Sequence, residues 1–185
     1  MSQTDQIRVG MLKFLWELNK PVSLNEIAEK TGLTKRTAFM HLLWLRKAGH
    51  IEVSEDGFYT ITETGKDVLG FPKVDLGLSQ KILSKTQPDR SFYFYLGLGQ
   101  PLGISSDNLT DFCEKIKTVD VKSVEFHTAR GDFELWVHYL GDIELAKRLR
   151  LIKEANLNGE ALRDRLYQTI KTRCDELIKK LVENA

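Results

Sequence analysis

Residues 21–69 combine two short helical patterns, a tight turn between them and a pair of short strands, an order that few folds accommodate. Ser23 followed three residues later by Glu26 is a capping box, in which each side chain satisfies a backbone amide at the start of a helix. Gly32 ends that helix, because glycine adopts the left-handed conformation at low cost. Thr34 then offers a hydroxyl cap to a second helix. This spacing predicts two helices joined by a short turn.

The flanking segments complete a small domain around these two helices. Residues 4–19 place apolar side chains at helical spacing and predict a preceding helix. Residues 51–53 and 58–61 are predicted strands, joined by a hairpin turn at Asp56-Gly57. We therefore expect one domain over residues 1–70.

The order of three helices and a hairpin resembles the winged helix-turn-helix of bacterial and archaeal transcription regulators. The resemblance implies that the helix after the turn is presented to a partner, usually the major groove of double-stranded DNA. We predict that this helix buries Ala38, Leu42 and Leu45, and its ends carry cations suited to phosphate contacts. The candidate DNA-binding residues are Lys35, Arg36, Thr37, Met40, His41, Trp44, Arg46 and Lys47.

Two features depart from the DNA-binding pattern and support a second hypothesis. Phe39, Leu43 and Trp44 form an apolar patch on the same helix, and the hairpin tip carries Glu55 and Asp56, which would face phosphates. The chain has 27 basic and 26 acidic residues, so its net charge of +1 does not draw it to nucleic acid as a whole. The alternative is a winged helix that binds a protein partner through this patch and does not bind DNA.

The rest of the chain indicates a linker and a helix-rich domain. Residues 71–90 are the predicted linker, and residues 91–185 the second domain, with a buried strand at 91–98 followed by an irregular glycine-rich loop. Residues 121–140 fit either a hairpin, by alternation, or a helix whose apolar face Gly141 would close, and we favour the helix. The predicted fold class is α+β and mainly helical, with a winged helix first and a short sheet in the second domain.

One segment of the second domain has a distinctive set of residues. They are Phe126-His127, the run Arg130-Gly131-Asp132-Phe133, Trp136, Gly141-Asp142 and Glu144-Leu145-Ala146. With them, residues 92–177 resemble a small domain of unknown function found in archaeal and bacterial proteins. That family brings no assigned reaction, so the resemblance implies a fold unit and not a function.

A dense polar cluster lies among aromatic residues in this segment. Its members, the candidate ligand-binding residues, are His127, Arg130, Asp132 and Glu134. One interpretation is a pocket for an anionic or hydroxylated effector, with Arg130 as anion partner and His127 as a switchable donor. The other, which we favour, is a buried ion-pair network that fixes a helix junction, with Asp132 and Asp142 as helix caps.

Assembly and compartment follow from simpler features. The apolar stripe of a long last helix, at about residues 159–182, continues almost to the chain end and predicts a homodimer. Cys113 and Cys174 lack the spacing of a zinc site or disulfide scaffold, which suits a cytoplasmic protein. We predict no signal peptide, membrane span, metal, cofactor or catalytic residue. The predicted function is a DNA-binding transcription regulator, not an enzyme, whose second domain dimerises or binds an effector.

Overall fold

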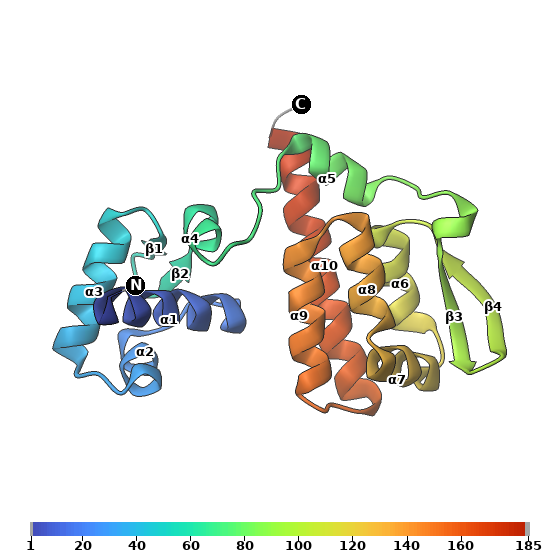
Figure 1. The fold of residues 1–185 in the computed structure, drawn as a ribbon, viewed down its shortest axis with the longest axis horizontal. Helices are drawn as coiled ribbons and strands as arrows, with labels where there is room; N and C mark the ends of the chain where they lie inside the picture. Colours follow the sequence, from blue (N-terminus) through green and yellow to red (C-terminus); the bar gives the residue numbers. More distant parts are fainter. Residues whose placement is uncertain (1, 184–185) are drawn as a thin grey trace. The chain divides into compact units, whose positions relative to one another are not determined.

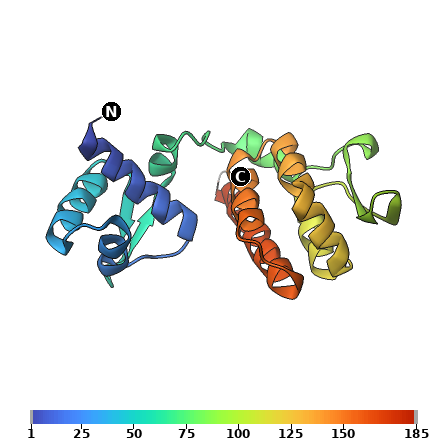
Figure 2. The same cartoon turned by 60° about the horizontal axis from the view of Figure 1, so that its bottom comes forward.

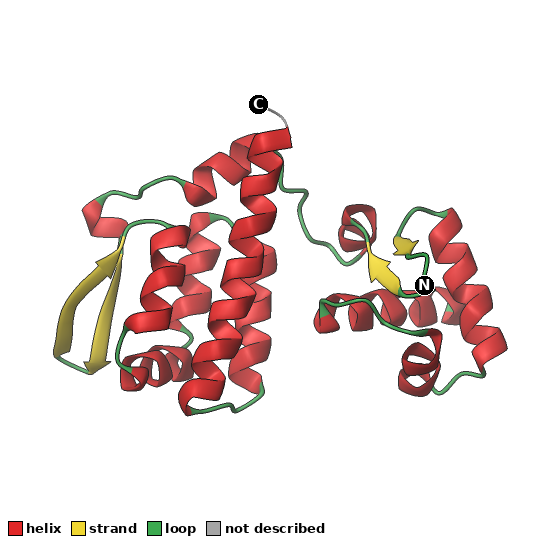
Figure 3. Cartoon of the chain, turned by 180° about the vertical axis from the view of Figure 1, so that it is seen from behind, coloured by secondary structure: helices red, strands yellow, loops and turns green. Residues whose placement is uncertain are grey.

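The computed structural model describes residues 2–183 and divides the chain into two compact units. The first unit is Met1–Lys73 and the second is Val74–Ala185. Each is built mainly from helices and contains a small antiparallel sheet (Figure 1, Figure 3). The predicted α+β, mainly helical class is confirmed.

The first unit has the order of elements that the sequence predicts. Its elements are α1 (Gln3–Leu18), α2 (Leu24–Thr31), α3 (Lys35–Lys47), β1 (Ile51–Val53), β2 (Tyr59–Ile61) and α4 (Glu63–Val68). The two strands pair antiparallel, and Val22, just before α2, forms a further bridge to Tyr59 of β2. That bridge ties the pair of helices to the hairpin that follows them.

The hydrogen bonds at the helix starts are those expected from the sequence. Ser23 Oγ accepts the amide of Glu26 at 3.3 Å, and a carboxylate oxygen of Glu26 accepts the Ser23 amide at 2.9 Å. Gly32 follows α2 with φ of 67°. Thr34 Oγ1 accepts the amide of Thr37 at 3.2 Å and starts α3. These local bonds set the turn between the two helices.

The first unit has one apolar core, and α3 turns one face toward it. Ala38, Leu42 and Leu45 are each at most 1% exposed, as predicted. They pack with Met11 and Leu12 of α1, among others. With this face buried, the opposite face of α3 points outward.

The second unit places a hairpin beside a group of helices. Its elements are α5 (Leu76–Leu83), the 3₁₀ turn η1 (Pro88–Arg90), β3 (Phe92–Gly97), β4 (Gln100–Ser106), α6 (Leu109–Thr118), α7 (Val121–Arg130), α8 (Asp132–Leu140), α9 (Ile143–Glu154) and α10 (Gly159–Glu183). α10 packs against α5, α6, α7 and α9. The β3–β4 hairpin contacts α6 and α7 and stands at one side of the helices (Figure 1, Figure 2).

Residues 121–140 form helices, and the hairpin alternative is wrong. α7 and α8 meet at Gly131, whose φ of 77° reverses the chain. Phe133 and Val137 are buried, as the helical face predicts. The expected cap is wrong, however, because Asp132 is the first residue of α8 and no side chain caps this helix.

The predicted irregular loop after β3 is wrong, because residues 100–106 form β4. Phe92 of β3 lies opposite Ser106 of β4, and the pairing shifts register on either side of Tyr95. Gly99 and Gly103 take positive φ of 72° and 68°. Glycines at such irregularities indicate a loop in the sequence, whereas pairing with β3 makes the segment a strand. β3 itself is buried only at Phe92 and Phe94, and Tyr93 is 48% exposed, so the prediction of a buried strand holds for one face.

The apolar stripe of α10 packs inside its own chain. Its members Leu162, Leu166, Ile170, Cys174 and Leu177 are at most 4% exposed, whereas Leu181, the last member of the predicted stripe, is only partly buried. They belong to the core that α6, α8 and α9 also line. α10 is long because it packs along α5, α6, α7 and α9 of its own chain. The stripe therefore does not support the predicted homodimer.

The segment predicted as a linker contains ordered elements. α5 and η1 both lie within residues 71–90, and Ile82 of α5 is fully buried in the second core. Phe71 belongs to the first unit, where its ring centroid lies 4.7 Å from that of Trp16. The division between the units falls after Lys73.

A buried ion-pair network joins α10 to the start of α9. Arg173 donates from Nε and Nη2 to the two carboxylate oxygens of Asp142, at 2.7 and 3.0 Å. Arg173 Nη1 lies 3.2 Å from a carboxylate oxygen of Glu144 and 2.9 Å from one of Glu176. Burial opposes the charge of Arg173, but the hydrogen bonds and charges of Asp142, Glu144 and Glu176 together outweigh it and raise the pKa of the guanidinium. Asp142 also caps α9, as predicted, by accepting the amide of Leu145.

Candidate nucleic-acid interface and candidate ligand pocket

The outward side of α3 carries the candidate DNA-binding residues. Lys35, Arg36, Thr37, Met40, Trp44, Arg46 and Lys47 are exposed, and His41 is partly buried. The cations stand at the two ends of the helix, and its sequence contains no acidic residue. The free amides of the first helical turn add partial positive charge near Lys35 and Arg36. This arrangement suits two phosphate contacts on either side of a groove.

Trp44 has a partner that the sequence does not indicate. The guanidinium carbon of Arg8, on α1, lies 3.8 Å from the centroid of the Trp44 ring. The imidazole of His50 meets the same ring edge-on, with centroids 6.0 Å apart. Arg8 covers one face of the Trp44 ring, and this cation–π contact places a further positive charge beside α3. Only the packing of α1 on α3 shows this pair.

The apolar patch is partly covered. Phe39 and Trp44 are 46% and 44% exposed, and Leu43 is partly buried. Met40, beside them, is 58% exposed. These side chains leave apolar surface on the same face that would meet DNA.

The hairpin tip keeps its carboxylates at the surface. Ser54 and Phe58 close the turn by backbone and hydroxyl hydrogen bonds, and Gly57 has φ of 80°. Glu55 and Asp56 at the tip are exposed. A phosphate contact by this tip would therefore be unfavourable.

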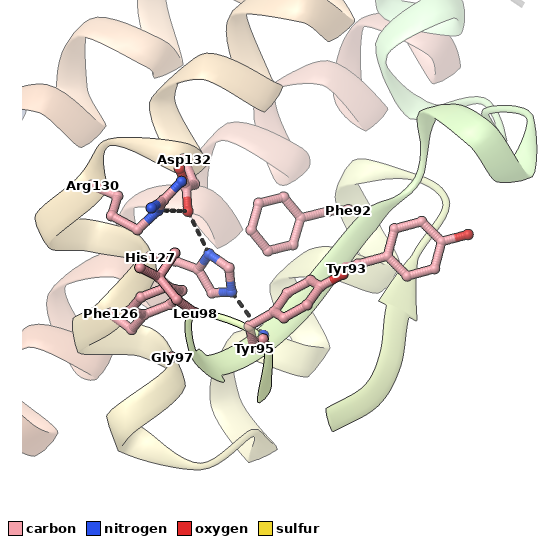
Figure 4. Close-up of a pocket in the computed structure, with 10 residues that line it drawn as sticks. Phe92, Tyr93, Tyr95, Gly97, Leu98, Phe126, His127, Arg130 and Asp132 are labelled. Carbon is pink, nitrogen blue, oxygen red and sulfur yellow. Dashed lines mark hydrogen bonds and ion pairs between the residues drawn. The ribbon is translucent and has the colours of Figure 1, made fainter. Parts of the chain in front are cut away.

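A hollow of about 290 Å³ lies in the second unit between the β3–β4 hairpin and α7. Figure 4 shows its side chains, which come from β3, the hairpin turn, α7 and the start of α8. The lining residues are Phe92, Tyr93, Tyr95, Gly97, Leu98, Gly99, Phe126, His127, Arg130 and Asp132. Three of the four predicted ligand-binding residues meet here.

His127 is a buried side chain in the wall of this hollow and makes two hydrogen bonds. Its Nε2 accepts the backbone amide of Tyr95 at 2.9 Å, and its Nδ1 lies 2.7 Å from Asp132 Oδ2 (Figure 4). Because an amide can only donate, Nε2 carries no proton and Nδ1 donates to Asp132. The neutral ring thus connects β3 to the α7–α8 junction. This is the junction-fixing role that the sequence favours, now with a strand included.

Glu134 does not join this cluster. Its carboxylate lies 3.3 Å from Arg150 Nε of α9 and does not line the hollow. Glu134 stands two residues after Asp132 on α8, so the helical turn carries its side chain away. Glu134 therefore lies apart from the other three predicted residues.

The electrostatics of His127 lead to a prediction about pH. Burial lowers the pKa of His127, and the bond to Asp132 only partly offsets this. The folded state therefore disfavours the proton relative to the unfolded chain. The contribution of neutral His127 to the stability of the folded state is complete above the unfolded pKa, about 6.5. It is lost as the pH falls from there through the lower folded pKa, by at most about 1.4 kcal/mol per pH unit.

We expect this loss to appear when the protein is compared with His127→Gln, which does not titrate. Hydrogen exchange of the second unit measures the unfolding free energy of each form. The stability advantage of the unaltered protein should narrow between about pH 7.5 and about pH 5. An advantage that is equal at both pH values would contradict the lowered pKa.

Comparison with known proteins gives one match. The profile of a family described as FaeA-like protein matches residues 8–57, from α1 to the hairpin tip. No curated protein and no solved structure matches the chain. The match and the order of elements support a winged helix-turn-helix domain in the first unit. The match ends before the second unit begins.

Among residues 2–183, no group of three or more His, Cys, Asp or Glu side chains is placed to hold a metal ion. No helix in that part of the chain is long and apolar enough to cross a membrane.

Proposed function

We propose that the first unit binds double-stranded DNA through α3, and that the chain is a transcription regulator and not an enzyme. The observation that carries the proposal is the pair of exposed cations at each end of α3, with no acidic residue between them. Such cations bind phosphates on the two sides of the major groove, while the helix between them faces the bases.

The middle of α3 supplies the side chains for reading bases. Thr37 and His41 can donate or accept hydrogen bonds, although the Thr37 hydroxyl also lies 2.9 Å from that of Thr34. Met40, which is 58% exposed, suits an apolar contact with a thymine methyl group. Few polar groups are available, so we expect modest sequence discrimination and a large contribution from phosphates.

A second candidate is a winged helix that binds a protein. The exposed apolar surface of Phe39, Met40 and Trp44, together with the acidic hairpin tip, favours it. Such surface is typical of protein contacts, because an apolar patch that remains in water lowers solubility. This candidate and DNA binding use the same face of α3, so they give opposite results in one experiment.

The test is a titration of the full chain against a fluorescent DNA duplex at several salt concentrations, read by anisotropy. Each phosphate contact contributes about −0.9 to the slope of log affinity against log salt, so four cations predict roughly −3 to −4 per copy of the chain. The same titration against unrelated duplexes separates phosphate binding from base reading. A lack of binding at low salt would overturn the proposal and favour the protein contact.

We also propose that the protein works as a homodimer in the cytoplasm. The dimer rests on the two-fold symmetry of most sites that winged helices read, and no longer on α10. The two buried, free thiols Cys113 and Cys174 support a reducing compartment. Light scattering at tens of micromolar should give twice the mass of one chain. A mass of one chain, both alone and with duplex, would contradict the dimer.

A further inference from the structure

We propose that the hollow between the β3–β4 hairpin and α7 binds a small, uncharged aromatic compound that carries a hydrogen-bond donor beside an acceptor. Aromatic amides and nucleobases have this chemistry. The proposal concerns the second unit alone and stands whether or not the first unit binds DNA.

The walls of the hollow suit a flat ring. Tyr95 and Phe126 stand on either side of His127, from β3 and α7, and the Phe92 ring meets the imidazole edge-on, with centroids 4.9 Å apart (Figure 4). At the hairpin turn, Leu98 is 79% exposed and borders the opening. A volume of about 290 Å³ holds one substituted ring, since an apolar cavity of about 150 Å³ already accepts benzene. Stacking and edge contacts with aromatic walls favour an aromatic ligand over an aliphatic one.

The polar edge of the hollow offers one acceptor and one group of donors. His127 Nδ1 and Arg130 Nε, which lies at 3.0 Å, both bond to the same carboxylate oxygen, Oδ2 of Asp132. Within residues 2–183, the structure shows no hydrogen bond to Oδ1 of Asp132 or from the terminal nitrogens of Arg130. A ligand that places an N–H against Oδ1 and a carbonyl oxygen against the guanidinium satisfies both groups at once.

The charge of the site favours an uncharged ligand. Asp132 and Arg130 cancel each other, and both ring nitrogens of neutral His127 are already occupied by Tyr95 and Asp132. An anion drawn to Arg130 would also meet the carboxylate of Asp132 beside it, which costs much of the attraction. This differs from the anionic or hydroxylated effector that one interpretation of the sequence suggested, and it removes His127 as a donor to the ligand. Arg130 remains available, since about half of its side chain is exposed.

Three compounds of nearly equal size test the polar edge. Benzamide carries a donor and an acceptor, acetophenone carries only the acceptor, and benzoate is an anion without a donor. Binding to the full-length protein is followed by the chemical shifts of the Tyr95 and Phe126 resonances. We expect benzamide to bind with a dissociation constant of about 1 mM or tighter, and the other two about tenfold more weakly. Benzoate binding as tightly as benzamide, or no binding by benzamide, would overturn the proposal.

Variants at Arg130 test the guanidinium separately from the fold. Arg130→Ala should weaken the binding of benzamide about tenfold. Arg130→Lys should weaken it nearly as much, because a lysine ammonium cannot bond to Asp132 and to the ligand at the same time, as a guanidinium can. Arg150→Ala is the matched control, since Arg150 pairs with Glu134 outside the hollow. Melting curves confirm that each variant is folded, and the half-exposed position of Arg130 makes this the expected result. If Arg130→Lys and Arg130→Ala bind benzamide as the unaltered protein does, the assignment fails.

Discussion

Replacement of Arg173 by methionine is expected to destabilise the second unit by about 3–5 kcal/mol. Asp142 and Glu144 are 0% and 6% exposed at their side chains, and both lie next to the Arg173 guanidinium. Methionine is unbranched and apolar but shorter and uncharged, so Asp142 would stay buried without a cation, while Glu144 would keep Arg148, whose Nη2 lies 2.8 Å away. Asp142 must then take up a proton, or water must enter the core. Hydrogen exchange of amides in α9 and α10 reports the loss for this unit alone.

Lys171→Met is the matched control on the same helix. Lys171 also forms an ion pair, with Asp175 at 2.7 Å, but the two side chains are 48% and 61% exposed. An exposed pair in water contributes about 1 kcal/mol at most, because solvent screens it. Similar losses for the two variants would show that burial of the Arg173 network is not what stabilises this unit.

The double charge reversal Lys35→Glu and Arg36→Glu is expected to produce the largest loss of DNA binding. Both side chains are exposed at the start of α3, where the helix would enter the groove. Loss of two phosphate contacts makes the salt slope shallower by about 2, and lowers affinity by about 50-fold or more near 0.1 M salt. The effect should be equal for all duplexes, since phosphates carry no sequence information. Anisotropy titrations of the full chain measure both quantities.

The control for net charge is the double reversal Lys117→Glu and Lys122→Glu. These exposed lysines belong to the second unit, so the change in total charge is the same without a change on α3. The control should bind DNA within a few-fold of the unaltered protein. If both double variants weaken binding equally, total charge explains the effect and α3 does not carry it.

Local chemistry determined most of the first unit from the sequence. A capping box such as Ser23 with Glu26 needs only residues three apart, and the turn at Asp56-Gly57 needs only a glycine that takes positive φ. The inward stripe of Ala38, Leu42 and Leu45 follows from helical period alone. Each signal lies within one or two turns of chain, so it is readable without a tertiary structure.

Contacts between distant segments decided the rest. Residues 100–106 form a strand because they pair with β3. The stripe of α10 is buried within its own chain as far as Leu177. The side chain of Glu134 lies outside the polar cluster, because α8 directs it toward Arg150. The sequence by itself determined the winged helix and grouped His127 with Asp132. Only the tertiary structure placed Tyr95 against His127, because a bond between residues 32 positions apart depends on how strand and helix pack.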